Sequence, residues 1–173
     1  ITLNVTTAVP SLLVGYAGGS GVLNQTAGDN TFVDGAAYGV YAVGYDGTGV
    51  ANHSGGTVNM GGSAFEVGAY NGTGTYNLSD TGEVLLGAGS TIYVGNGPTG
   101  NGLLEISDSA QFHQGNVVTA GTQIFLGSDG GTGKILQTGA DSDVTIVTDN
   151  PVHVGYGAAG GVGTYQLDDG SLI

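Results

Sequence analysis

The sequence contains no cysteine and no tryptophan, and its one basic residue, Lys134, stands against 14 acidic residues. Without cysteine there is no disulfide framework, and the redox compartment stays undetermined. The net charge of −13 gives a surface that repels nucleic acid and anionic membranes. No apolar run approaches the length of a transmembrane helix. We therefore expect no nucleic-acid partner and no membrane insertion.

Proline and typical helix formers are also scarce, whereas glycine accounts for 37 of the 173 residues, about three times its usual share. Glycine shows no three-residue period, which excludes collagen. Apolar residues still make up 39% of the chain and fall in short β-prone runs, which disfavours disorder. This composition predicts many short strands joined by tight turns.

A three-residue strand that ends in glycine recurs six times. Successive glycines are 29, 24, 27, 32 and 28 residues apart in Leu12-Leu13-Val14-Gly15, Tyr41-Ala42-Val43-Gly44, Phe65-Glu66-Val67-Gly68, Ile92-Tyr93-Val94-Gly95, Ile124-Phe125-Leu126-Gly127 and Val152-His153-Val154-Gly155. A second glycine follows each of them, at Gly21, Gly49, Gly74, Gly102, Gly133 and Gly163. We expect these glycines at sharp corners, where the backbone needs positive φ or a close approach.

Two further strands follow in every repeat. The second strands are expected at 22–26, 50–54, 75–79, 103–107, 134–138 and 164–168, and the third at 31–34, 57–60, 83–86, 111–114, 143–146 and 171–173. Three short strands in each repeat are typical of a coil of a parallel β-helix. The sequence therefore predicts an all-β fold, a parallel β-helix (β-solenoid) of about six rungs of three short strands each, with no capping helix.

Alternation along the strands predicts which side chains face the core. In the first strands the outward residues are Leu13, Ala42, Glu66, Tyr93, Phe125 and His153, and their neighbours face inward. In the second strands the inward residues are Leu23, Ala51, Tyr76, Leu104, Ile135 and Tyr165, followed by Gln25, His53, Leu78, Ile106, Gln137 and Leu167. A β-sandwich, the main competitor, would not repeat its glycines in phase.

The repeats resemble the β-strand repeats in passenger regions of bacterial autotransporters and related surface proteins. The matching segments are Ile92-Tyr93-Val94-Gly95-Asn96-Gly97, Gly74-Thr75-Tyr76-Asn77-Leu78-Ser79 and Ser54-Gly55-Gly56-Thr57-Val58-Asn59, and the resemblance covers residues 11–173. It implies a right-handed β-helix at the cell surface, without catalytic residues to carry over.

The two ends of the sequence fall at a similar phase of the repeat. We expect one domain over residues 1–173, in which 1–10 form an N-terminal strand and connector of a preceding coil and 11–173 form six repeats. No segment looks like a capping helix, and an uncapped solenoid edge can template polymerisation. The residues expected to mediate self-association are Ile1, Thr2, Leu3, Asn4, Val5, Ser171, Leu172 and Ile173.

Five Asn-x-Ser/Thr sequons occur, at Asn4, Asn24, Asn52, Asn71 and Asn77, and one interpretation is a glycosylated face. Asn24, Asn52 and Asn77 also share one outward column of the second strands. The alternative that we favour is that the column is inherited with the repeat, since later rungs keep the Ser/Thr but have Glu105, Leu136 and Gln166 in place of Asn. Stacked asparagines also form stabilising amide ladders without any glycan.

Acidic turn residues are spread over the repeats, at Asp29, Asp46, Asp80, Asp108, Asp129, Asp141, Asp143, Asp149, Asp168 and Asp169. They lack the phase of a calcium-binding glycine–aspartate repeat, and calcium needs six to eight converging oxygens. We therefore expect no metal site and no cofactor, with weak Ca²⁺ binding at most. His53, His113 and His153 lie in different columns, and Lys134 is the only base, so we expect no enzyme.

Apolar outward residues of the first strands, Leu13, Ala42, Tyr93 and Phe125, predict a lateral contact patch. The alternative is that long loops, such as residues 116–123, fold over it. The leading functional hypothesis is a secreted structural subunit that polymerises end to end into an extracellular filament. The alternatives are a fragment of an adhesin-like passenger stalk, and a β-helix that binds or cleaves carbohydrate. The expected partners are further copies of the chain, then glycans or neighbouring filaments.

Overall fold

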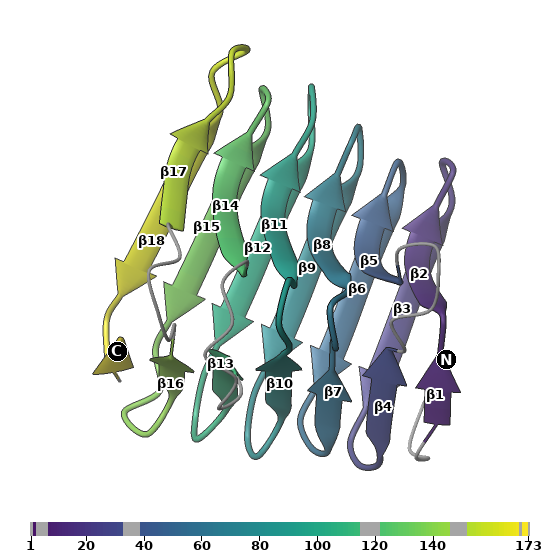
Figure 1. Cartoon of the computed structure of the whole chain (residues 1–173), viewed down its shortest axis with the longest axis vertical. Helices are drawn as coiled ribbons and strands as arrows, with labels where there is room; N and C mark the ends of the chain where they lie inside the picture. Colours follow the sequence, from purple (N-terminus) through teal and green to yellow (C-terminus); the bar gives the residue numbers. More distant parts are fainter. Residues whose placement is uncertain are drawn as a thin grey trace.

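The computed structural model describes residues 2, 7–32, 39–114, 122–145, 152–169 and 171–172. These residues form three parallel sheets and no helix (Figure 1). The chain passes through the sheets in turn, so each rung adds one strand to each of them. Among the described residues two sheets have six strands and one has seven. They make a parallel β-solenoid, which confirms the predicted fold class.

The strands are short, as the spacing of the repeats requires. The first sheet contains β2 (Ser11–Tyr16), β5 (Val40–Tyr45), β8 (Ala64–Ala69), β11 (Thr91–Asn96), β14 (Gln123–Ser128) and β17 (Val152–Tyr156). The second contains β3 (Ser20–Gln25), β6 (Thr48–His53), β9 (Thr73–Leu78), β12 (Asn101–Ile106), β15 (Thr132–Gln137) and β18 (Val162–Leu167). The third contains β1 (Thr7–Val9), β4 (Asp29–Phe32), β7 (Thr57–Asn59), β10 (Glu83–Leu86), β13 (Gln111–Gln114), β16 (Asp143–Thr145) and β19 (Ser171–Leu172).

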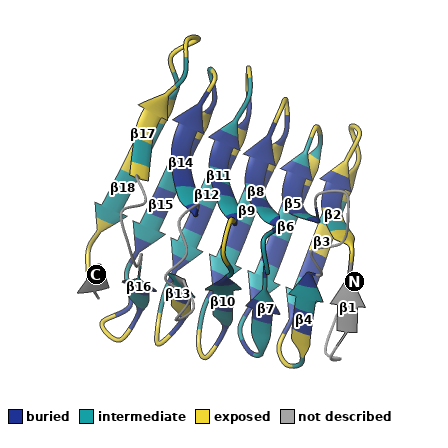
Figure 2. Cartoon of the chain, in the orientation of Figure 1, coloured by how far each residue is buried: buried dark blue, intermediate teal, exposed yellow. Residues whose placement is uncertain are grey.

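The register matches the predicted columns. Ile92 of β11, for example, pairs with Phe65 of β8 and with Ile124 of β14. The inward side chains of the four middle rungs are fully buried (Figure 2). The core is therefore one continuous apolar column along the solenoid axis, with Tyr41, Tyr76, Phe65 and Phe112 in edge contact.

The corner between the first and second sheets depends on glycine at two positions. Gly44 has φ of 74°, and a Cβ atom there would overlap the backbone carbonyl of Thr73. A Cβ on Gly74 would overlap the carbonyl oxygen of Val43. The second glycine of each repeat lies inside the second strand and not in the turn, so these strands begin two residues earlier than expected. Glycine is required there because the two sheets touch backbone to backbone.

Polar side chains at one inward position of the second sheet form hydrogen bonds with backbone carbonyl groups of the turn that follows the strand. Gln25 Nε2 donates to the carbonyl of Gly28 at 3.0 Å, and Gln137 Nε2 donates to that of Ser142 at 3.0 Å. His53 Nε2 lies 2.9 Å from the Gly56 carbonyl and its Nδ1 lies 2.9 Å from the Tyr76 hydroxyl. A carbonyl oxygen only accepts, so Nε2 donates; in the neutral form of the ring, Nδ1 then accepts from the Tyr76 hydroxyl. Burial lowers the pKa of His53, so inward histidine is a core residue here.

Candidate functional site

The last described rung exposes inward side chains that the four middle rungs bury. Val152 and Val154 of β17 are 41% and 53% exposed, whereas their register partners Ile124 and Leu126 are 2% and 0% exposed. Leu167, an inward residue of β18, is exposed as well. In the described chain β17 and β18 each have a strand partner on one side only. This end therefore presents apolar side chains together with unpaired backbone groups. Figure 2 shows β17 largely in the colour of exposed residues.

The opposite end presents a groove between two strand edges. β2 and β3 are the outermost described strands of the first and second sheets. A groove of about 380 Å³ lies between them, lined by Leu12, Leu13, Val14, Gly15, Ser20, Gly21, Val22 and Leu23. Its lining includes the inward residues Leu12 and Val14, so the groove opens toward the core.

The residues expected to mediate self-association lie partly within the described chain. Ser171 and Leu172 form β19, which pairs with β16. Thr2 forms a parallel bridge with Asn24 and so lies beside the second sheet. The N-terminal strand of the third sheet is Thr7–Val9, later in the chain than the alternation of the first residues suggested. Ile1, Leu3, Asn4, Val5 and Ile173 lie outside the described residues.

The expected lateral patch is only partly exposed. Leu13 is exposed and Tyr93 half-buried, but Ala42 is 0% and Phe125 is 7% exposed, so the expected exposure of these two residues is wrong. Phe125 stacks on Tyr93 at a centroid distance of 5.0 Å and on His153 at 4.6 Å. In-register rings on three successive strands bury the central one, a packing that alternation alone does not reveal. Most of residues 116–123, the loop considered as a cover, lies outside the described residues.

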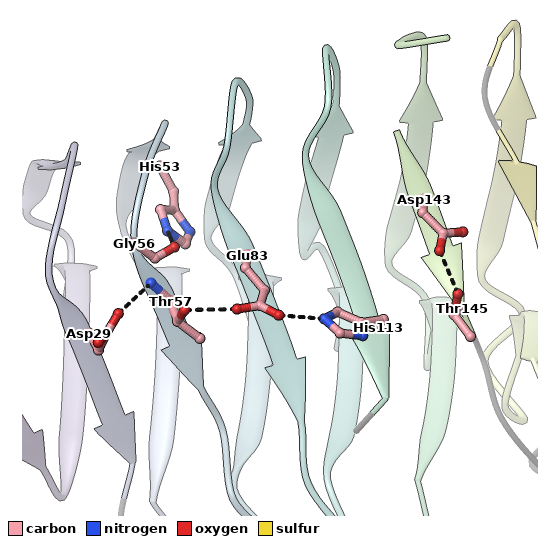
Figure 3. A network of polar contacts seen from close by, with 8 residues as sticks. All are labelled: Asp29, His53, Gly56, Thr57, Glu83, His113, Asp143 and Thr145. Carbon is pink, nitrogen blue, oxygen red and sulfur yellow. Dashed lines mark hydrogen bonds and ion pairs between the residues drawn. The ribbon is translucent and has the colours of Figure 1, made fainter. Parts of the chain in front are cut away.

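A polar bridge crosses the outer face of the third sheet (Figure 3). The Glu83 carboxylate on β10 accepts a hydrogen bond from the Thr57 hydroxyl of β7 at 2.8 Å. Its other oxygen lies 2.6 Å from His113 Nε2 of β13. Both carboxylate oxygens are therefore engaged, which makes Glu83 a link between three strands. Sequence reasoning missed this link because Glu83 and His113 are diagonal neighbours and do not share a column.

The asparagine column of the second sheet forms an amide ladder. Asn52 Nδ2 donates to Asn24 Oδ1 at 2.8 Å, and Asn77 Nδ2 donates to Asn52 Oδ1 at 2.8 Å. Asn71 lies in a turn, where its Nδ2 donates to Asp46 Oδ1 at 3.1 Å. The nitrogen atoms to which a glycan would be attached in Asn52, Asn71 and Asn77 therefore donate hydrogen bonds within the fold. Asn4 lies outside the described residues.

Several turn aspartates have a conformational role. Asp46 and Asp129 have φ of 52° and 51° in the turn after the first strand, and Asp80 and Asp108 have φ of 51° and 58° in the turn after the second strand. Aspartate tolerates this left-handed conformation better than most residues. Within the described ranges no group of three or more His, Cys, Asp or Glu residues is arranged to hold a metal ion.

Comparisons of the chain with known proteins found no match. No protein-family model matches the chain, no curated protein matches it, and no solved structure matches it. In the described part of the chain no helix is long and apolar enough to span a membrane.

Proposed function

We propose that this chain is a structural, extracellular β-solenoid subunit that associates end to end into a filament. The observation that carries the proposal is the exposure of inward valines at the last rung, Val152 and Val154. A first rung from a second copy would cover them as β17 covers Ile124 and Leu126 of β14, and would pair the open edge of β17. The acidic surface, at a net charge of −13, suits a highly soluble secreted protein.

The two open ends complement each other in strand order. β2 of one copy would continue the first sheet beyond β17 of another, and β3 would continue the second sheet beyond β18 once Thr2, which bridges Asn24 of β3, is displaced from that edge. Pairing of parallel edges in this way is heterologous, so it propagates without closing. A filament is the expected product.

The third sheet constrains the junction, because it has seven strands where the others have six. Suppose that β2 and β3 of an incoming copy pair directly with β17 and β18 of the copy already in the filament. In the third sheet, β1 of the incoming copy and β19 of the copy in the filament would then occupy the same place between β16 and the incoming β4. β1 pairs with β4 at three positions, whereas β19 pairs with β16 at two. We therefore expect the incoming β1 to replace β19, and removal of residues 170–173 to speed assembly.

Electron microscopy and sedimentation of the purified chain at neutral pH test the proposal. We expect filaments in the wild type, and loss of filaments in Val154→Glu, which places a charge on the exposed end rung. Leu103→Glu is the matched control, because it adds the same charge on an outward position of β12 beside Lys134, and it should still assemble. A wild-type chain that stays monomeric at high concentration would contradict the proposal and would favour a longer stalk, whose own coils cover these edges.

A further inference from the structure

Aromatic side chains along the first sheet and its turns form two ladders. The N-terminal ladder consists of Tyr16, Tyr45 and Tyr70, and its successive ring centroids lie 5.8 Å and 4.6 Å apart. The C-terminal ladder consists of Tyr93, Phe125, His153 and Tyr156, and its successive ring centroids lie 5.0 Å, 4.6 Å and 4.7 Å apart. The two ladders reach opposite edges of the sheet, at β2 and at β17 (Figure 1).

The outermost ring of each ladder is exposed. Tyr16 on β2 is 55% exposed and Tyr156 on β17 is 48% exposed. Both belong to one column of the sheet, which reads Tyr16, Tyr45, Ala69, Asn96, Ser128 and Tyr156 from rung to rung. An exposed tyrosine therefore stands at each described end of a column whose middle members are small.

The register of the sheet determines which side chains would meet at a junction between two copies. Ser128 pairs with Tyr156 in the same way as Tyr16 pairs with Tyr45. If β2 of an incoming copy pairs with β17 in this register, its Tyr16 lies directly beside Tyr156. We propose that Tyr156 stacks on Tyr16 of the next copy, and that this contact fixes the polarity and register of the junction. The inference rests on the end-to-end assembly proposed above, and it names the side chains that align the two copies.

The contact joins the two ladders into one. The four rings of one copy continue directly into the three rings of the next, so a single aromatic ladder crosses the junction. Ring pairs on neighbouring strands stabilise a sheet beyond the area that they bury. The existing pair of Tyr16 and Tyr45, at 5.8 Å in the same column, shows that the column accommodates two successive tyrosines.

A neighbouring column favours the same register. His153 stacks on Phe125 with an angle of 6° between the ring planes, and β17 has no strand on its other side among the described residues. The incoming residue in this column is Leu13, which is 43% exposed. Leu13 would therefore cover His153 while Tyr16 covers Tyr156.

Other arrangements of the junction lose the tyrosine contact. A shift of one residue turns the side chains of the incoming strand to the opposite face. A shift of two residues separates the two rings by roughly 7 Å along the strands. A head-to-head junction brings Tyr156 of one copy toward Tyr156 of the other. The stack of Tyr156 on Tyr16 is thus specific to one polarity and one register.

The critical concentration for filament formation, measured by sedimentation, tests the contact in a double-mutant cycle. Tyr16→Ala and Tyr156→Ala should each raise it by about tenfold, because each removes one ring of the stack. The double variant should also raise it by about tenfold and not by about a hundredfold, since both changes remove the same contact. Tyr70→Ala is the matched control, because it removes a ring that is 49% exposed but distant from the junction, and it should leave the critical concentration unchanged. Circular dichroism of each variant confirms that the solenoid is intact.

Photo-oxidative coupling of wild-type filaments tests the polarity directly. A ruthenium tris-bipyridine complex, with persulfate as the oxidant, joins neighbouring tyrosine rings as dityrosine, and mass spectrometry of the digested filaments identifies the linked residues. We expect a link between Tyr16 and Tyr156. Within one copy these residues lie on opposite edges of the six-stranded first sheet, roughly 24 Å apart at the usual strand spacing, so the link must join two copies.

The results separate this inference from the proposed function. Filaments that give a link between two copies of Tyr156, or no link between Tyr16 and Tyr156, would overturn the inference and leave end-to-end assembly in place. Additive effects of the two alanine substitutions would overturn it in the same way. A wild-type chain that forms no filaments would overturn both proposals.

Discussion

The Nε2 atom of His113 lies 2.6 Å from Oε1 of Glu83, so an imidazole on β13 is joined to a carboxylate on β10 (Figure 3). Burial acts to raise the pKa of Glu83, but the hydrogen bonds from His113 and Thr57 and the charge of His113 outweigh it. The pKa of Glu83 is therefore lowered from its ordinary value of 4.5. The unfolded chain consequently binds a proton at this site at a higher pH than the folded chain does.

From this difference we predict that Glu83 stabilises the fold above pH 4.5 and that its contribution disappears as the pH falls through the folded-state pKa. Glu83→Gln should lower the free energy of unfolding at pH 7 by about 1 kcal/mol, a small value because the pair is partly exposed. The difference from wild type should vanish at low pH. Urea unfolding at several pH values checks this, with Glu105→Gln as the control. A Glu83→Gln deficit that persists unchanged at low pH would show that the carboxylate charge is not its cause.

The amide ladder gives a second prediction. Asn52 is its central member, since its Nδ2 donates to Asn24 and its Oδ1 accepts from Asn77. Asn52→Ala should lower the free energy of unfolding by about 1–2 kcal/mol, because it removes two partly buried hydrogen bonds. Glu105→Ala, in the same column two rungs further on, serves as the control and should change stability by less than about 0.5 kcal/mol. Equal effects of the two variants would mean that the ladder adds nothing beyond side-chain packing.

The rungs and the core could be predicted from the sequence because a solenoid repeats one local pattern. Ile92 and Val94 are inward for the same reason as Ile124 and Leu126, so six copies of the pattern reinforce one another. The glycine at position 44 was also predictable. Glycine is required there both because φ is positive and because a Cβ atom would overlap the carbonyl group of Thr73 in the next rung.

Features set by contacts between rungs could not be predicted in the same way. Alternation places Phe125 outside, but stacking on Tyr93 and His153 buries it. Alternation also marks Glu66 as outward, and nothing in its own strand indicates that Oε2 is buried. These outcomes depend on the size of neighbouring side chains across the sheet, which a single-strand pattern does not contain.

The glycine corner gives a third prediction, with a control built into the chain. Gly44 and Gly18 have nearly equal φ, 74° and 76°, but a Cβ on Gly44 would overlap Thr73 whereas one on Gly18 has nothing within 4 Å. Gly18→Ala should cost about 1–2 kcal/mol for the left-handed conformation alone. Gly44→Ala should cost more than about 3 kcal/mol, since the two sheets must also move apart. Thermal and urea unfolding of both variants measures the difference, and equal costs would mean that the corner relaxes freely.

Asn30 gives the last prediction, because it occupies a core position with neither amide atom satisfied. It is 1% exposed, and both Oδ1 and Nδ2 lack a hydrogen-bond partner. Its register partner on β7 is Val58, and Val84 and Val144 occupy the same column in later rungs. A buried amide without partners destabilises a fold, whereas valine at that position needs none. Asn30→Val should therefore raise the free energy of unfolding by about 1–2 kcal/mol.

The matched control for that variant is Asn101→Val, at an exposed position where β12 begins. It makes the same chemical change without removing a buried polar group, so stability should stay within about 0.5 kcal/mol of wild type. Urea unfolding of the two variants and of the wild type gives the comparison directly. If Asn30→Val is less stable than wild type, the amide must bind a buried water or another group in solution. In that case the first rung would be held together by a polar contact, and its inward surface would be less apolar than that of the rungs behind it.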